Sequence, residues 1–273
     1  RCHEPQMGYI KRNNLKQSLH TLINSYKYKE AISLYEHYKK TFTDELDNDI
    51  LALLEHGKLR LELEYKLALE KINRVGDLSL KSVFTDWKRI KLHEFLMLME
   101  VRLKQGQIED FILKITPFMY ELMLYYFSTT YHVKWDEFEK WTPGGPRTDM
   151  VSFKEKHPQL YSSWYAHTKT PQFNEIQLSL NHMLHMLEDQ PNVNPLLLKQ
   201  LNDIRHIERK IRNKIAHEVV VLTEVEICKS VSIKSLQSFL ELIQTVFSTI
   251  MNPSKQNELI YDTINTYVLE QIQ

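Results

Sequence analysis

A row of four isoleucines most constrains what this chain can fold into. Ile204, Ile207, Ile211 and Ile215 are separated by three, four and four residues, so at about 100° per residue they form one narrow apolar stripe. We therefore predict an α-helix that begins near Pro195 and includes all four. Helical spacing recurs along the chain, which has only 6 glycines and 9 prolines. Because helix interiors exclude both residue types, we predict an all-α fold.

The polar face of this helix carries two rows of side chains. On an ideal helix with Ile204 at 0°, three arginines lie at about 80–140°: Arg212, Arg205 and Arg209. A second group lies at about 180–240°: Asn213, His206, His217 and Lys210. The apolar stripe predicts a buried core contact, whereas the two polar rows need a separate explanation.

The composition of the chain excludes several kinds of binding partner. Lys and Arg together number 35, as do Asp and Glu, so no overall basic field is available to hold duplex nucleic acid, and stable DNA binding is not expected. Any RNA contact must come from a local patch. Cys2 and Cys228 provide neither a disulfide framework nor a metal-ligand spacing, so we expect reduced intracellular thiols and no metal site. We find no secretory segment and no run of about 18 apolar residues, so no membrane partner is expected.

The chain is expected to consist of a linker and two helical regions. Residues 1–12 are polar and contain Pro5 and Gly8, so we expect a linker from an upstream domain. Residues 13–106 show helical periodicity without a chemical motif and are expected to form an N-terminal helical bundle. From Gln107 the chain becomes more apolar and aromatic, and residues 107–273 are expected to form the second helical domain.

Residues 142–171 are predicted to form a long loop, because they contain Pro-Gly-Gly-Pro at 143–146. No strand is expected before these glycines and no Gly-Lys-Ser/Thr follows, so a phosphate-binding loop is not predicted. Tyr161, Trp164 and Tyr165 either stack on nucleobases or anchor a surface excursion.

The arrangement R-x-x-x-x-H, from Arg212 to His217, has parts suited to phosphate chemistry. Histidine titrates near neutral pH and can transfer a proton, and arginine is a forked, permanently charged donor to phosphate oxygens. Asn213 lies one turn before His217 and can orient its imidazole or contact a phosphate oxygen. These groups suit metal-independent RNA scission, in which the ribose 2′-hydroxyl attacks the adjacent phosphorus and leaves a 2′,3′-cyclic phosphate and a 5′-hydroxyl.

Helix geometry favours a site shared between two copies of the chain. Arg212 and His217 are about 140° apart on an ideal helix, so one helix does not direct both at the same phosphate. Two such helices facing each other about a twofold axis would form a composite cleft. By itself, an arginine and a histidine at this spacing more often belong to a solvated helix face with a structural histidine.

The surrounding stretch, IRHIERKIRNKIAHEVVVLTEVEI at 204–227, resembles the HEPN ribonucleases (higher eukaryotes and prokaryotes nucleotide-binding). It is most similar to the Csm-type accessory ribonucleases of type III CRISPR systems. Their pattern is an arginine, a polar residue, a short spacer and Ala-His, which Arg212, Asn213 and His217 match. The segment YKYKEAISLYE at 26–36 is also similar, so the resemblance covers most of the chain.

The resemblance implies a HEPN domain over residues 107–273, with Arg212, Asn213 and His217 as catalytic residues. Arg205, Arg209 and Lys214 are weaker candidates for substrate contacts, because solvated charges or ion pairs with Glu208 would explain Arg205 and Arg209 equally well. It further implies a homodimer in the prokaryotic cytoplasm that cuts single-stranded RNA without metal or cofactor, as part of antiviral defence.

The resemblance also implies an activator, cyclic oligoadenylate, bound by a Rossmann-like CARF sensor domain. No glycine-rich βαβ unit occurs in this sequence, so the sensor is expected to lie outside it. Two other hypotheses remain open: a HEPN toxin or abortive-infection ribonuclease of another defence system, and a non-catalytic helical dimerisation module.

Overall fold

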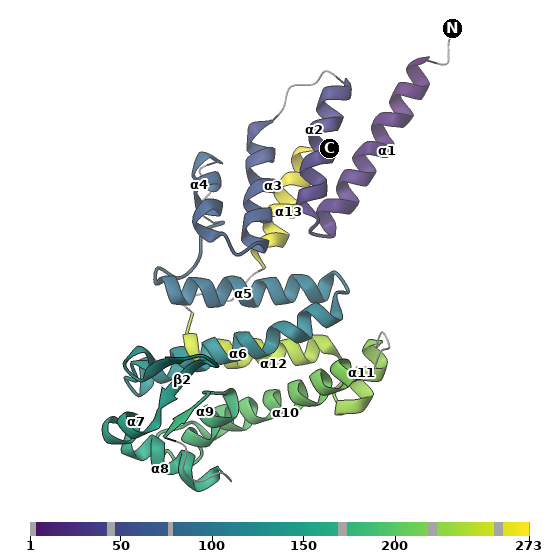
Figure 1. Ribbon diagram of the computed structural model, residues 1–273. Helices are drawn as coiled ribbons and strands as arrows, with labels where there is room; N and C mark the ends of the chain where they lie inside the picture. Colours follow the sequence, from purple (N-terminus) through teal and green to yellow (C-terminus); the bar gives the residue numbers. More distant parts are fainter. Residues whose placement is uncertain are drawn as a thin grey trace. The chain divides into compact units, whose positions relative to one another are not determined.

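The computed structural model describes residues 4–42, 47–75, 79–168, 174–217, 223–253 and 259–272 (Figure 1). Within these ranges the chain forms thirteen α-helices, one short 3₁₀ helix and a small three-stranded sheet, which confirms the prediction of an all-α fold. None of the helices described is both long and apolar enough to span a bilayer. The chain divides into two compact units: unit 1 comprises residues 1–106 and 253–273, and unit 2 comprises residues 107–252.

Unit 1 is a helical bundle built from both ends of the sequence. Its helices are α1 (Glu4–Asn24), α2 (Tyr28–Phe42), α3 (Asn48–Leu61), α4 (Tyr65–Val75), α5 (Trp87–Lys104) and α13 (Ile260–Gln271). Helix α1 already begins at Glu4, so the expected linker over residues 1–12 is largely helical. Pro5 is compatible with this, because the first turn of a helix tolerates proline.

Helix α13 belongs to unit 1, which corrects the expectation that residues 107–273 form one domain. Figure 1 shows α13 beside α2 and α3. Tyr261 on α13 stacks on Tyr28, with ring centroids 6.2 Å apart, and the Tyr28 hydroxyl donates to Asn265 Oδ1 at 2.7 Å. Ile264 and Val268 are fully buried in the same core. Helical periodicity predicts that these residues are buried but not which unit buries them.

Helix α3 illustrates a close approach that requires glycine. Gly57 lies inside α3, and a Cβ atom added there would be 2.9 Å from the ring of Tyr28. The chain turns after Leu61, where Leu63 adopts a positive φ of 61°. Gly57 therefore allows the aromatic ring to lie directly against the helix backbone.

His56, on α3, is a buried histidine held in its neutral form. Its Nδ1 is 2.7 Å from the carbonyl oxygen of Ala68, and its Nε2 is 3.4 Å from Arg60 Nη1. A neutral ring that donates at Nδ1 and accepts at Nε2 satisfies both contacts. Burial, and then the charge of Arg60, lower the pKa of His56 from 6.5 to about 4.

This depressed pKa predicts a pH-dependent stability of unit 1. Below pH 6.5 the unfolded chain binds a proton at His56 that the folded chain rejects until about pH 4. The free energy of unfolding should therefore be highest above pH 6.5 and fall as the pH drops to about 4, by up to about 3 kcal/mol. Urea unfolding at several pH values should show a smaller slope for His56→Asn than for the unchanged chain. Equal slopes would contradict the assignment.

Unit 2 is contiguous in sequence, and its helices are α6 (Ile108–Thr130), α7 (Met150–Lys156), α8 (Pro158–His167), α9 (Leu180–Leu187), α10 (Pro195–His217), α11 (Glu224–Val231) and α12 (Leu236–Met251). The 3₁₀ helix η1 (Trp135–Glu137) and strands β1 (Glu139–Thr142), β2 (Gly145–Asp149) and β3 (Glu175–Ile176) complete it. Helices α6, α10 and α12 pack against one another (Figure 1).

The predicted loop over residues 142–171 is wrong. Strands β1 and β2 form an antiparallel hairpin in which Trp141 pairs with Pro146, and Gly145 has a φ of 99° at its turn. Helices α7 and α8 follow, because Asp149 caps the first through the backbone N–H groups of residues 151 and 152 and Pro158 begins the second. The glycines thus mark a tight turn between strands.

The aromatic residues of this region divide between core and surface. Trp164 is buried, Tyr161 is half-buried, and Tyr165 is exposed. Trp164 therefore anchors α8 in the core of unit 2, which agrees with the structural alternative. The rings of Tyr161 and Tyr165 stack with centroids 6.0 Å apart.

Candidate active site on helix α10

Helix α10 presents the isoleucine stripe to the core of unit 2. Asn194 caps its start by accepting a hydrogen bond from the backbone N–H of Leu196 at 2.9 Å, and the helix continues to His217. Ile204 and Ile211 are fully buried and Ile207 is half-buried. The side chains of residues 215–217 lie outside the described part of the structure. The described part of the stripe is therefore buried against α6 and α12, as its spacing predicts.

A carboxylate interrupts the buried face of α10. Glu208 is only 1% exposed, and its carboxylate accepts a hydrogen bond from the Thr116 hydroxyl of α6. It also forms ion pairs with Arg205 and Arg212, the latter with 3.5 Å between Arg212 Nε and Glu208 Oε1. A buried charge is tolerated when it is paired and hydrogen-bonded in this way. Glu208 thus joins the core of unit 2 to the arginine row.

Arg205 is held by contacts within unit 2. Its Nε donates to Asn181 Oδ1, next to the start of α9, at 2.7 Å, and its Nη1 donates to Glu208. These contacts give Arg205 a structural role, which the ion-pair explanation of the arginine row anticipated. Arg209 is exposed and Lys214 is half-buried. Substrate contacts by these three residues stay predictions.

Arg212 differs from Arg205 in its exposure. Its side chain is 41% exposed, and Glu208 pairs with its Nε atom. Within the described residues, its terminal Nη nitrogens make neither a hydrogen bond nor an ion pair. Glu208 therefore restrains the inner edge of the guanidinium and leaves the outer edge for an anion. Asn213, the next residue, is exposed.

His217 is the last residue of α10, and only its backbone is described. Because α10 is continuous from Arg212 to His217, these two positions lie about 140° apart around the helix axis. A single α10 thus separates the two residues, in keeping with the geometric reason for a composite site. The participation of a second copy stays a prediction.

Sequence reasoning considered Glu208 only as an ion-pair partner of Arg205 and Arg209, and missed its burial and its pairing with Arg212. On the ideal helix Glu208 falls at about 40°, between Ile204 at 0° and Arg212 at about 80°. A carboxylate at the edge of an apolar stripe, with arginines three residues before and four after, was the available signal. Thr116 could not be found in this way, because it lies on α6 and meets Glu208 only in the folded chain.

Metal binding has no candidate residues in the described ranges. Among these residues, no three histidine, cysteine, aspartate or glutamate side chains form a group that could hold a metal ion. The two histidines of α9, His182 and His185, are three residues apart. Burial, and then the charge of His185, lower the pKa of His182. His185 Nδ1 instead lies 3.0 Å from Glu188 Oε1.

Comparison with known proteins connects this helix to a family. A family model described as the Cas_Csm6 HEPN domain matches residues 82–269. The fold is similar to that of Enterococcus italicus Csm6 bound to cyclic hexa-2'-fluoro-hexa-dAMP, with a TM-score of 0.70 and 14% sequence identity. That match covers 96% of this chain and 58% of the other, so this chain spans less than two thirds of that protein. No curated protein matches this sequence.

Proposed function

Because this chain belongs to the family of the Csm6 HEPN domain, we propose that it is a single-stranded RNA endoribonuclease of CRISPR type III antiviral defence. Its catalytic residues are Arg212, Asn213 and His217, and two copies of the chain form one composite site. His217 either takes the proton from the ribose 2′-hydroxyl as that oxygen attacks phosphorus, or gives a proton to the 5′-oxygen as it leaves. Arg212 stabilises the negative charge that develops at phosphorus, and Asn213 orients His217 or the phosphate.

The ion pair between Arg212 and buried Glu208 supports this proposal independently of the family match. An arginine that must neutralise a transition state is most effective when its position is fixed before substrate binds. Glu208 is itself held by Thr116 and by Arg205. A row of solvated charges would not require a buried carboxylate behind it.

We further propose that cyclic oligoadenylate activates the enzyme through a sensor domain outside this sequence, in the prokaryotic cytoplasm. The similar Enterococcus italicus structure is bound to a cyclic hexa-adenylate analogue, which supports this class of activator. The alternatives are a HEPN toxin of another defence system, which would not respond to cyclic oligoadenylate, and a non-catalytic dimerisation module, which would not cut RNA.

The proposed reaction predicts a strict requirement for the 2′-hydroxyl. A single-stranded RNA oligonucleotide should be cut, and the same sequence in 2′-deoxy form should remain intact, because its attacking oxygen is missing. Products should carry 2′,3′-cyclic phosphate and 5′-hydroxyl ends by mass spectrometry. Excess EDTA should leave the rate unchanged within about 2-fold. Cleavage of the 2′-deoxy strand, or strict metal dependence, would exclude this reaction.

Glu208→Gln should loosen Arg212 and lower RNA cleavage by about 10-fold, which corresponds to about 1.4 kcal/mol of transition-state stabilisation. The amide keeps the shape of the carboxylate but removes the charge that pairs with Arg205 and Arg212. The free energy of unfolding of unit 2 should fall by about 2 kcal/mol. Asp203→Asn serves as the control, because it also removes one negative charge from α10 but at an exposed position. It should change neither the rate of RNA cleavage nor the free energy of unfolding. Normal cleavage by a folded Glu208→Gln variant would show that Glu208 does not position Arg212.

A further inference from the structure

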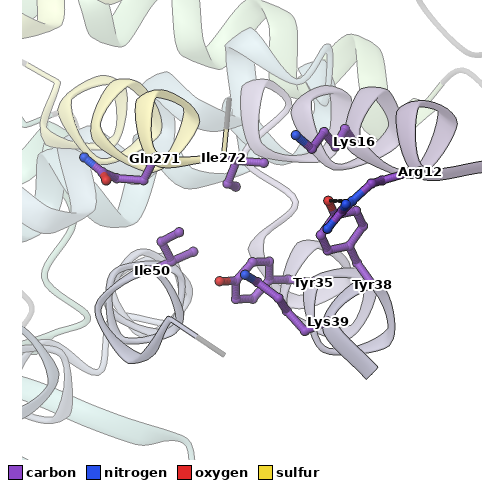
Figure 2. A pocket seen from close by; sticks show the side chains of 8 residues that line it. All are labelled: Arg12, Lys16, Tyr35, Tyr38, Lys39, Ile50, Gln271 and Ile272. Carbon is purple, nitrogen blue, oxygen red and sulfur yellow. Dashed lines mark hydrogen bonds between the residues drawn. The ribbon is translucent and has the colours of Figure 1, made fainter. Parts of the chain in front are cut away.

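A second candidate site lies within unit 1 and uses no residue of α10. A cavity of about 200 Å³ opens between α1, α2, α3 and α13 (Figure 2). Eight described residues line it: Arg12, Lys16, Tyr35, Tyr38, Lys39, Ile50, Gln271 and Ile272. The lining includes three cationic side chains and no acidic one.

The three cations come from two neighbouring helices. Arg12 and Lys16 are one turn apart on α1, and Lys39 lies on α2. All three are half-buried, so water screens their charges less than it would on an open surface. An anion in the cavity would lie close to these three positive charges and would be stabilised by them.

Tyrosine side chains contact two of the three cations, Arg12 and Lys39. Arg12 Nε donates to the Tyr38 hydroxyl at 3.0 Å, drawn as a dashed line in Figure 2. Lys39 Nζ is 5.5 Å from the centroid of the Tyr35 ring, within the range of a cation–π contact. Both tyrosines are buried: Tyr35 is 1% exposed and Tyr38 is 5% exposed. Because buried rings restrain the cations, binding an anion would require little ordering of side chains.

Two isoleucines and one amide complete the lining of the cavity. Ile50 of α3 and Ile272, directly after α13, are its aliphatic side chains, and Gln271 of α13 supplies the amide (Figure 2). A water molecule takes up about 30 Å³ in the liquid, so the cavity has room for a phosphate group and part of an attached sugar. Arginine and lysine are the preferred partners of phosphate. The lining therefore suits a phosphate group, with two isoleucines that can contact an attached sugar.

We propose that this cavity binds the phosphate group of a nucleotide, either free or at the end of an RNA strand. The site lies in unit 1 and uses none of the residues assigned to RNA cleavage. Its existence therefore does not depend on the proposed ribonuclease activity.

Titration calorimetry at constant ionic strength tests the site with AMP, inorganic phosphate and adenosine as probes. AMP should bind, and adenosine should bind at least 10-fold more weakly because it lacks the phosphate. A variant with Arg12→Gln, Lys16→Gln and Lys39→Gln should bind AMP at least 10-fold more weakly. The matched control carries Lys11→Gln, Lys27→Gln and Lys40→Gln, which are exposed positions on or between the same helices. It should bind AMP within 2-fold of the unchanged chain.

Competition identifies the source of the phosphate. A 5′-phosphorylated DNA oligonucleotide, which lacks the 2′-hydroxyl and so resists the proposed cleavage, should displace AMP if strand ends bind. AMP binding without displacement assigns the site to free nucleotides. Failure of AMP, inorganic phosphate and the oligonucleotide to bind would overturn the proposal, as would equal losses in the pocket and control variants.

Two single changes keep the test valid if the triple variant unfolds. Lys39→Gln removes one half-buried charge, and Tyr38→Phe removes only the hydroxyl that accepts from Arg12. Each should weaken AMP binding by about 3-fold or more, with unchanged helical circular dichroism. Unchanged AMP affinity in both would overturn the site. Cleavage of RNA should be retained in every pocket variant, which separates failure of this proposal from failure of the ribonuclease assignment.

Discussion

His217→Ala should lower the rate of RNA cleavage by at least about 100-fold, because it removes the only side chain of the R-x-x-x-x-H arrangement that can transfer a proton near neutral pH. Loss of a general acid or base of this kind typically lowers a rate by about 10²–10⁴-fold. Single-turnover cleavage of a labelled single-stranded RNA measures the effect directly, and size-exclusion chromatography with light scattering measures the oligomeric state. The proposed dimer should persist in this variant.

His206→Ala is the matched control for this prediction. His206 is exposed and lies on the same polar face of α10, about 20° from His217 on an ideal helix. The same imidazole is removed from the same face, yet cleavage should change by less than about 3-fold. Normal cleavage by a folded His217→Ala variant would refute the catalytic assignment and favour the non-catalytic dimerisation module. Equal losses in both variants would show that the histidine row acts through its charge.

Glu94→Gln should destabilise unit 1 by about 3–5 kcal/mol, since breaking a buried ion pair leaves an uncompensated charge. Glu94 lies on α5 and is 1% exposed, and Arg60 on α3 is fully buried. Their two contacts are 2.9 Å, from Arg60 Nε to Glu94 Oε2, and 2.5 Å, from Arg60 Nη2 to Glu94 Oε1. Arg60 Nη1 also donates to the carbonyl oxygen of Leu80 at 2.9 Å. Urea unfolding followed by circular dichroism measures the loss.

The double variant Arg60→Met with Glu94→Leu distinguishes a broken pair from a damaged core. Apolar side chains of similar volume can replace a buried ion pair with little loss, or with a gain, of stability. The double variant should therefore recover most of the stability that Glu94→Gln removes. A double variant less stable than the single one would show that the pair contributes net stability to the bundle.

The features that sequence reasoning could predict are those that local periodicity determines. The spacing of Ile204 and Ile211 identifies α10 and its buried face, and the few glycines identify the fold class. The hairpin at 139–149 was missed because its short strands show no clear alternation of apolar and polar residues. The place of α13 was missed because its partner Tyr28 lies 233 residues before Tyr261, and periodicity carries no information about such distant contacts.

The candidate site also contains some residues that the sequence identifies and others that only the fold brings together. Arg212, Asn213 and His217 are neighbours in sequence, so a motif can find them. The carboxylate that restrains Arg212 is also local, but its burial follows from packing against α6. Helical position placed Glu208 near the apolar stripe, whereas only the fold shows that Thr116 completes its hydrogen bonding.

The return of α13 to unit 1 has a consequence for the order of events during synthesis. Unit 2 is continuous over residues 107–252, so all its contacts are available once that segment has left the ribosome. Unit 1 is translated first, yet Tyr28 and its neighbours lack their α13 partners until residues 260–271 emerge. Synthesis of unit 2 is therefore complete before that of unit 1, so unit 2 can fold while the side chains of unit 1 that contact α13 still lack their partners.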